Sequence, residues 1–195
     1  MTYKKVKAYK FINVTKTAIR NTKSQAEEIM TKAKTIALVA LMAALANVMS
    51  IPPLAIPLPL GPFTSSIHFF QLAIFLCGIL AGPWAGLLGG AVGGLYMSIT
   101  RIPFVIGGIA ILGGSAGLFA KKFRPAIAGS LAWLVQAPYV LVTDYVWFTL
   151  FSGASSAIAL GLILPIMVTL TLEAIVCAIL ADIIVHYLKR AGITL

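Results

Sequence analysis

Charged residues are scarce in this chain of 195 residues: only 10% are Asp, Glu, Lys or Arg, and just five of them are acidic. Histidine and cysteine are also rare, with two of each, and Cys77 and Cys177 both lie within apolar runs. So few carboxylates exclude the acidic cluster that a metal-dependent lipid transferase needs. A thiol in an apolar run is normally a small buried hydrophobe, so we expect no metal site, no cofactor and no disulfide.

The chain also lacks short motifs that mark two kinds of enzyme. It has no H-E-x-x-H, the zinc peptidase motif, and no G-x-x-x-x-G-K-[ST], the phosphate-binding loop of ATPases. It has no base-reading motif either, so we expect no nucleic acid partner. We therefore predict a binding protein rather than an enzyme.

Apolar residues dominate what is present. Hydrophobic residues make up 60% of the chain, and the mean hydropathy is +1.00. Residues 67–99 contain no charge and are interrupted only by Gly82-Pro83, which predicts a membrane hairpin of two passes that turns at this pair. Glycine recurs every fourth residue there, and Gly86, Gly90 and Gly94 form one stripe. Because small residues let membrane helices approach closely, we expect another helix to pack on this stripe.

The apolar runs predict an all-α polytopic membrane protein with six transmembrane helices, at about residues 36–51, 66–80, 84–99, 104–120, 126–151 and 158–187. The sixth run is longer than a bilayer requires, so tilt, protrusion or a kink at Pro165 must absorb the excess. Between the first two runs, the Pro-rich segment Leu54 to Pro62 is predicted to be an extended apolar loop.

The N-terminal region differs in composition. Residues 1–34 hold nine Lys or Arg against Glu27 and Glu28, so we predict a basic cytoplasmic tail with a juxtamembrane helix over residues 1–35, and a six-helix substrate-binding domain over residues 36–190. Ser24 and Glu27 have the spacing of a capping box at the start of that helix. Glu28 and Lys32 have the spacing of an i,i+4 ion pair.

Positive charge near the predicted spans is distributed unevenly. With six spans both termini lie on one side, and that side receives Lys32, Lys34, Lys121, Lys122, Arg124, Lys189 and Arg190. The other side receives Arg101 alone. Basic residues favour the cytoplasmic side, so we predict a multi-pass protein of the cell membrane with both termini cytoplasmic, in contact with anionic lipid.

Polar side chains collect in the outer half of the predicted bundle. On the fifth span one face and its shoulders carry Gln136, Tyr139, Thr143, Asp144 and Trp147, while His68 and Gln71 lie one turn apart on the second span and Tyr96 lies on the third. Polar groups inside a membrane point to the bundle interior, so we predict that these residues bind a ligand. Two other interpretations stay open: Asp144 pairs with Arg101, and Trp147 belongs to an interfacial aromatic belt.

Glu173 is the main acidic residue of the inner half. It satisfies a kinked helix, pairs with a partner subunit, or carries a proton, and the sequence does not decide among these roles.

Several features together resemble a known family. They are the six predicted spans in a chain of this size, the small-residue pattern from Ala40 to Ala44, the long apolar first loop, and the run G-x-L-A-G-P-W-A-G-L-L-G-G that starts at Gly78. Over about residues 36–190 the chain resembles the substrate-binding S components of energy-coupling-factor (ECF) vitamin transporters.

The resemblance implies a division of labour among subunits. Ala40 and Ala44 would contact a transmembrane coupling subunit, which sits on two cytoplasmic ATPases. A vitamin or vitamin precursor would bind near the outer surface under the loop at residues 54–62, and the loaded S component would topple in the membrane to release it inside. Riboflavin-like, pyrimidine or thiamine-like, and pterin-like ligands all fit the flat heteroaromatic shape that the polar cluster suits.

Two other functional classes stay open. An ion-coupled secondary carrier of a small heteroaromatic solute would need its own coupling residue, for which Glu173 and Asp144 are the candidates. A membrane enzyme is the less favoured alternative, because the available Ser, His and acidic residues form no reactive constellation.

Overall fold

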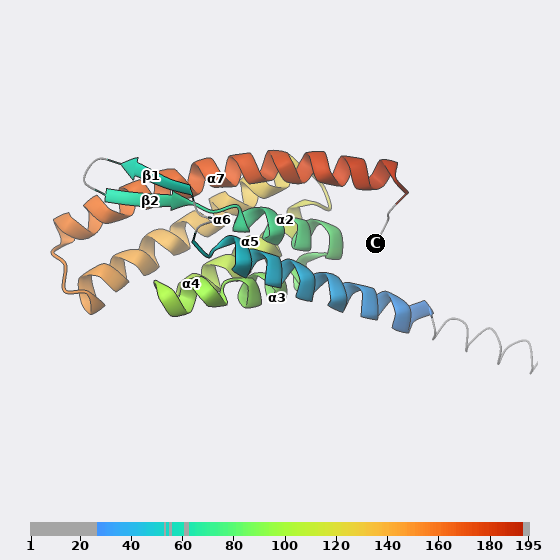
Figure 1. The fold of residues 1–195 in the computed structure, drawn as a ribbon, viewed down its shortest axis with the longest axis horizontal. Helices are drawn as coiled ribbons and strands as arrows, with labels where there is room; N and C mark the ends of the chain where they lie inside the picture. The colour runs from blue at the N-terminus through green and yellow to red at the C-terminus, as the bar shows by residue number, and fades with distance from the viewer. Residues whose placement is uncertain (1–26, 53, 55, 61–62, 193–195) are drawn as a thin grey trace, which may run out of the picture. The chain divides into compact units, whose positions relative to one another are not determined.

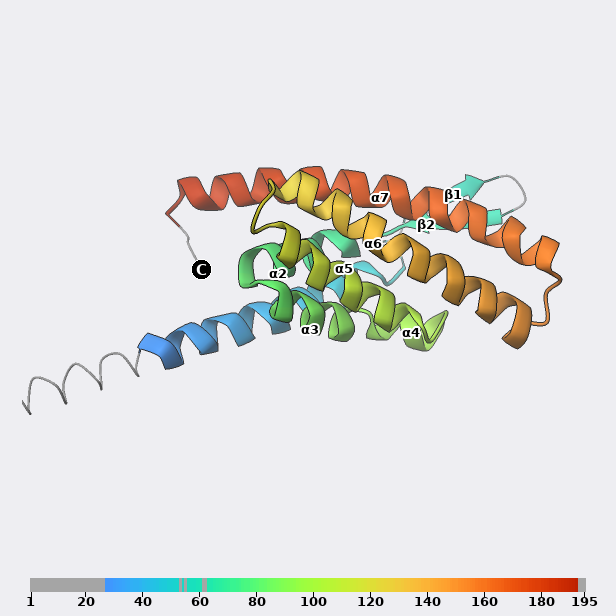
Figure 2. The ribbon, with the colours of Figure 1, turned by 180° about the vertical axis from the view of Figure 1, so that it is seen from behind.

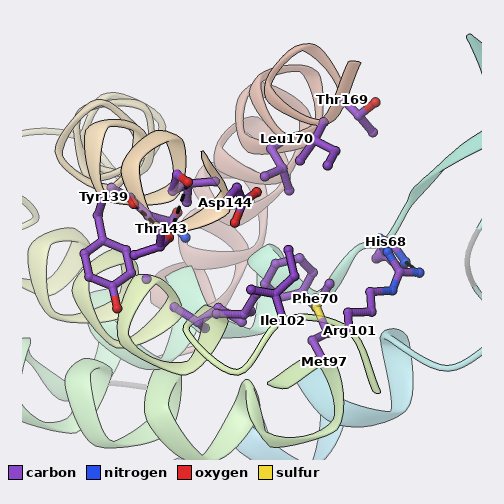
Figure 3. Close-up of a pocket in the computed structure, with 16 residues that line it drawn as sticks. His68, Phe70, Met97, Arg101, Ile102, Tyr139, Thr143, Asp144, Thr169 and Leu170 are labelled. Carbon is purple, nitrogen blue, oxygen red and sulfur yellow. Dashed lines mark hydrogen bonds between the residues drawn. The ribbon is translucent and has the colours of Figure 1, made fainter. Parts of the chain in front are cut away.

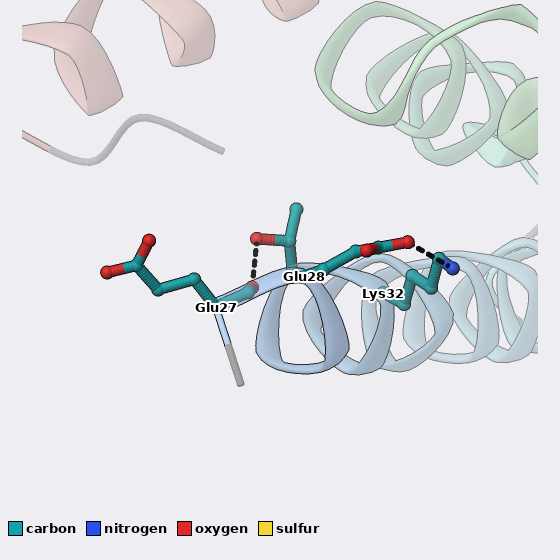
Figure 4. Close-up of polar contacts among 4 residues, drawn as sticks. Glu27, Glu28 and Lys32 are labelled. Carbon is teal, nitrogen blue, oxygen red and sulfur yellow. Dashed lines mark hydrogen bonds and ion pairs between the residues drawn. The ribbon is translucent and has the colours of Figure 1, made fainter. Parts of the chain in front are cut away.

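The computed structural model describes residues 27–52, 54, 56–60 and 63–192. By compactness the chain divides into Met1–Ile36 and Ala37–Leu195. In the first part the described residues begin the helix Glu27–Met49. The predicted Glu28–Lys32 ion pair is confirmed, with 2.7 Å between Nζ and Oε1 (Figure 4), but both side chains are exposed, so it contributes little stability. Ser24, the first residue of the predicted capping box, lies outside the described residues.

The second part is built mainly from helices. After the helix Glu27–Met49, its described elements are β1 (Ile56–Leu60), β2 (Phe63–Ile67), α2 (Phe70–Ala81), α3 (Pro83–Gly93), α4 (Leu95–Thr100), α5 (Val105–Phe119), α6 (Pro125–Val146), the π-helical turn η1 (Trp147–Phe151) and α7 (Ser156–Arg190).

Helix α2 lies at the centre of this part. It packs against α3, α5 and α7, and α6 lies between α5 and α7 (Figures 1 and 2). Eight of the 12 residues of α2 are buried, and Ile74 and Phe75 are among the largest fully buried side chains. The sequence of α2 is apolar on every side, which is the pattern of a helix surrounded by other helices.

The predicted packing of a helix on the glycine stripe is confirmed, and the partner helix is α5. A Cβ added to Gly86 would overlap the carbonyl oxygen of Gly113, and one added to Gly90 would overlap the carbonyl oxygen of Ile109. One turn further along the same face of α5, a Cβ on Gly117 would come within 2.6 Å of the carbonyl oxygen of Gly78 in α2. Backbones therefore touch directly where α2, α3 and α5 meet.

Residues 113–117 of α5, Gly-Gly-Ser-Ala-Gly, have the spacing G-x-S-x-G of a hydrolase nucleophile elbow. An elbow needs a sharp turn from strand to helix, whereas this segment lies inside α5. The hydroxyl of Ser115 donates to the carbonyl of Ile111 one turn earlier, and Gly113 and Gly117 serve helix packing. The local structure therefore gives this serine no nucleophilic role.

The third predicted span is divided at Gly94 into α3 and α4. Asn47, on the helix Glu27–Met49, inserts its amide at this point: Nδ2 donates to the carbonyl of Val92 at 2.8 Å, and Oδ1 accepts the N–H of Tyr96 at 2.8 Å. In an uninterrupted α-helix these two backbone groups would bond to each other. The side chain replaces that bond with two of its own, which satisfies the backbone and separates the two helices.

Within the apolar loop predicted at residues 54–62, the described residues 56–60 form an extended strand that pairs into a hairpin. β1 and β2 are antiparallel, with Ile56 opposite Ile67 and Leu60 opposite Phe63. Pro57 lies opposite Ser66 and Pro59 opposite Thr64, and a hairpin of two strands tolerates proline because each strand has an unpaired edge. The second predicted span, placed at 66–80, therefore starts too early, because α2 begins at Phe70 and residues 63–67 are strand.

Three described helices are long and apolar enough to cross a membrane: Glu27–Met49, Pro125–Phe151 and Ser156–Arg190. Helices α2 and α5 are apolar but shorter, and at 12 residues α2 extends only about 18 Å. α7 has 35 residues, more than the roughly 20 that a bilayer core requires, as the sequence predicted. An all-α membrane protein with one small hairpin describes these elements, and the count of six spans stays a prediction.

The glycine contacts make a prediction about stability. Gly86→Ala should lower the free energy of unfolding by about 1–3 kcal/mol or more, because the neighbouring atoms are backbone and cannot rotate away. The measurement is the melting temperature of the detergent-purified protein. Gly161→Ala in α7 is the matched control, since nothing lies within 4 Å of its Cβ position, and it should be neutral or stabilising. Equal melting temperatures for Gly86→Ala and the unmodified protein would contradict the packing.

Candidate functional site

A pocket opens between α6, α7, the end of α4 and the segment that joins β2 to α2 (Figure 3). The empty space within it, open solvent included, is about 730 Å³. Apolar walls come from five described helices, and the residues are Phe70, Met97, Val105, Ile109, Val140, Ile166 and Leu170, with Ile102 from the α4–α5 connection.

Polar groups enter the pocket from opposite sides in Figure 3. His68 and Arg101 lie on one side, and Tyr139, Thr143 and Asp144 of α6 lie on the other. Gln136 also lines the pocket, one turn before Tyr139 and Val140 on the same helix. The spacing 136, 139, 140, 143 and 144 is that of one helix face, so the periodicity of α6 brings these side chains together.

His68 and Arg101 contact each other, with 3.1 Å between Nη2 of the guanidinium and Nε2 of the imidazole. A guanidinium is always protonated and can only donate, so Nε2 of His68 must be the acceptor. The proton of the neutral ring is therefore on Nδ1, which is buried and has no partner among the described residues. The His68 side chain thus offers an N–H donor to a ligand.

The α6 face supplies mainly acceptors. Oε1 of Gln136 is buried without a partner among the described residues. The carboxylate of Asp144 is 4% exposed and makes no hydrogen bond or ion pair within the described part of the chain. The hydroxyls of Tyr139 and Thr143 donate to backbone carbonyls, of Phe104 at 3.1 Å and of Tyr139 at 2.8 Å, so only their oxygen lone pairs remain available.

The structure brings together five of the eight residues that the sequence suggested for ligand binding: His68, Gln136, Tyr139, Thr143 and Asp144. The other three do not line the pocket. Gln71 is fully buried in the core, where Nε2 donates to the carbonyl of Leu170 at 3.4 Å. Tyr96 is the residue whose backbone N–H binds Asn47.

Trp147 lies beyond the end of the pocket. α6 ends at Val146, and the wider π-helical turn that follows changes the direction of successive side chains. The indole stacks on Phe151, with ring centroids 5.2 Å apart, and meets Phe104 edge-on. The α-helical periodicity used for the prediction does not extend through this turn.

The pairing of Asp144 with Arg101, which the sequence left open, is not formed, because the guanidinium contacts His68 instead. Arg101 is itself a pocket residue that the sequence analysis did not assign to ligand binding. One feature of the sequence could have indicated this role: Arg101 is the one Lys or Arg near the spans on its side of the predicted membrane. Thr169 also lines the pocket and had no distinguishing signal within an apolar run.

Glu173 of α7 lies beside this site rather than in it. It is 1% exposed, and its Oε2 accepts the backbone N–H of His68 at 3.3 Å. This hydrogen bond ties the segment between β2 and α2 to α7. It therefore fixes the backbone position from which the His68 side chain reaches Arg101 and the pocket.

The Glu173 contact predicts a difference between two variants. Glu173→Gln keeps an acceptor for the His68 N–H, whereas Glu173→Leu removes it and leaves a buried donor unsatisfied. Both remove the carboxylate, so their comparison isolates the hydrogen bond. Glu173→Leu should be less stable than Glu173→Gln by about 1–3 kcal/mol in thermal unfolding. Equal stability of the two variants would show that the contact does not hold this segment.

The described residues contain no group of three His, Cys, Asp or Glu side chains placed to hold a metal ion. The site combines a cation, a carboxylate, an amide and an imidazole with apolar walls. That arrangement suits reversible binding of a small polar ring, because the polar atoms without partners would be satisfied by a ligand's own hydrogen-bonding edge.

Comparison with known proteins identifies the family. A family model described as ECF-type riboflavin transporter, S component, matches residues 30–190. The chain belongs to this family. A solved structure of the S component of a bacterial ECF transporter has the same fold, with a TM-score of 0.52 and 19% sequence identity over 82% of this chain and 95% of that chain. No curated protein sequence matches significantly. The protein is thus a membrane-embedded, substrate-binding subunit of an ECF transporter, a class of binding subunits rather than enzymes.

Proposed function

We propose that this S component binds riboflavin, or a vitamin with a similarly flat heteroaromatic ring, in the pocket between α6, α7 and the end of α4. The observation that carries the proposal is the polar inventory of this pocket. Arg101 and Nδ1 of His68 are donors, and Oε1 of Gln136 and the Asp144 carboxylate are acceptors. The name of the matching family supports riboflavin among the candidate vitamins.

Riboflavin needs this combination of groups. The pyrimidine edge of its ring system presents an N–H between two carbonyl oxygens, so a site for it must both donate and accept. The flat faces of the ring require apolar walls, which Phe70, Met97 and Leu170 supply on three different elements. Its hydroxylated side chain would find further polar partners in Thr143 and Thr169.

We further propose that the pocket faces the outside of the cell, in a six-span arrangement with both termini cytoplasmic. Arg101 is the cation near the pocket, whereas Lys121, Lys122, Arg124, Lys189 and Arg190 lie near the other ends of the helices. This asymmetry supports the orientation, because cytoplasmic segments of membrane proteins are enriched in Lys and Arg. The β1–β2 hairpin leads directly into His68 and would act as the lid over the bound vitamin.

The coupling subunit would bind the outward face of the helix Glu27–Met49. Ala40 and Ala44 are exposed there, on the side away from the buried residues Ala43 and Ala46. Two alanines one turn apart allow a partner helix to approach closely. Two ATPase subunits on the cytoplasmic side would drive release of the vitamin, and this chain would supply recognition alone.

Ligand binding is tested with two buried glutamines. Gln136→Met should weaken riboflavin binding by about tenfold or more, because the ligand's polar edge would then face an apolar group. Gln71→Met is the matched control: it changes a glutamine of similar burial that does not line the pocket, so affinity should stay within about threefold. The measurement is quenching of flavin fluorescence by the detergent-purified protein.

Mass spectrometry of small molecules extracted from the same preparation identifies any vitamin that copurifies. Absence of riboflavin binding together with a bound thiamine or pterin would redirect the proposal to that vitamin. Vitamin uptake that persists in cells without any ECF ATPase would instead support an ion-coupled carrier.

Coupling is tested separately from ligand binding. Ala40→Leu and Ala44→Leu should each reduce copurification with the coupling subunit by about tenfold, while riboflavin affinity stays within about threefold, because the added bulk lies outside the pocket. Ala157→Leu, at an exposed alanine near the start of α7, is the control for added bulk on a lipid-facing surface. Loss of vitamin affinity in the Ala40 or Ala44 variant would mean that this face supports the pocket rather than a partner.

A further inference from the structure

A second set of clefts lies at the opposite end of the bundle from the vitamin pocket, where α2 and α5 end, α6 begins and α7 ends. Two adjoining clefts, each of about 1,080 Å³ including open solvent, share Arg124, Pro125, Val185 and Lys189. Because they share these walls, we treat them as one basic cleft. It is large enough for a headgroup and the upper part of a lipid rather than for a single ion.

The rim of the basic cleft is strongly cationic. Four basic side chains line it: Lys121, Lys122, Arg124 and Lys189. Asp182 is the one carboxylate among its lining residues, and none of the four cations forms a salt bridge within the described part of the chain. Four like charges gathered at one cleft repel one another, so an anionic ligand that bridges them would be bound favourably.

The floor of the basic cleft is apolar. Ile79 and Leu80 reach it from the last turn of α2, and Val185 and Leu188 reach it from α7. A free phosphate or an acidic protein surface would satisfy the rim but leave this floor without a partner. A phospholipid satisfies both, because its phosphate lies at the rim and its acyl chains continue along the apolar helices.

We propose that the basic cleft is a binding site for an anionic phospholipid, with the phosphate held by Lys121, Lys122, Arg124 and Lys189 and the acyl chains lying over the apolar floor. The proposal is independent of the identity of the vitamin. It gives the turn between α5 and α6 a role in fixing this end of the bundle at the membrane surface.

The test uses the full chain in nanodiscs of phosphatidylcholine with a minor fraction of phosphatidylglycerol, and native mass spectrometry counts the lipids retained. The double variant Lys121→Gln, Lys122→Gln should lose at least about fivefold in preference for phosphatidylglycerol over phosphatidylcholine. The double variant Lys32→Gln, Lys34→Gln removes the same charge from exposed residues elsewhere and should change that preference by less than about twofold. Lys121→Arg, Lys122→Arg should restore the preference.

Each other outcome overturns the proposal. An equal loss in both glutamine pairs would mean diffuse attraction to the membrane surface, and no loss in either would mean that the cleft does not select lipids. Displacement of phosphatidylglycerol by inorganic phosphate at matched concentration would mean a phosphate site without lipid specificity. Retained lipid preference with lost copurification of the coupling and ATPase subunits would mean an acidic protein partner. Unchanged melting temperatures in all variants verify that they are folded.

Discussion

Direct contact between glycine backbones holds this bundle together. Lipid tails are as apolar as the side chains of the helices, so moving a side chain from lipid into the bundle gains little free energy. Association of the helices therefore depends on close approach of their backbones. Gly86 and Gly90 of α3 provide it against Gly113 and Ile109 of α5, and Gly78 joins α2 to the same place. Because these atoms are backbone, the relative positions of α2, α3 and α5 are set with little freedom. The remaining helices, and the pocket between them, are built on this unit.

The pocket differs from this close-packed apolar core in its polar atoms. The neighbouring core consists of small and apolar residues, whereas His68 and Gln136 present buried polar atoms that have no partner among the described residues. An unsatisfied buried polar group costs free energy, and a ligand that supplies the missing hydrogen bonds removes that cost. The same atoms would penalise a ligand that lacks the matching donors and acceptors, so they contribute to selectivity as well as to affinity.

The predictions that the structure confirms rest on periodic patterns within single helices. The four-residue spacing of glycine located a helix-packing surface, the i,i+4 spacing of Glu28 and Lys32 located an ion pair, and the periodicity of α6 gathered Gln136, Thr143 and Asp144 on one face. Each depends only on the geometry of one regular helix. The wrong predictions concern places where a regular helix ends or where separate elements meet.

Three such places illustrate this limit. The π-helical turn moved Trp147 away from the pocket, and the short strand Phe63–Ile67 runs without a charge into an apolar helix, so its boundary left no mark in the sequence. Opposite charges suggested that Asp144 pairs with Arg101, but composition does not report distance, and His68 is the nearer partner. Long-range choices of this kind depend on how whole helices pack.

Asn47 connects two regions of the molecule that otherwise have separate roles. Its amide holds the ends of the break between α3 and α4, and α4 is followed directly by Arg101, which lines the pocket. Asn47 also lies one turn beyond Ala44, on the helix whose outward face is free of the bundle. A partner that displaces this helix must therefore move the anchor of α4 and the guanidinium at its end. By thermodynamic linkage the effect is reciprocal. If binding of such a partner lowers the affinity for the ligand by some factor, the bound ligand lowers the affinity for the partner by the same factor.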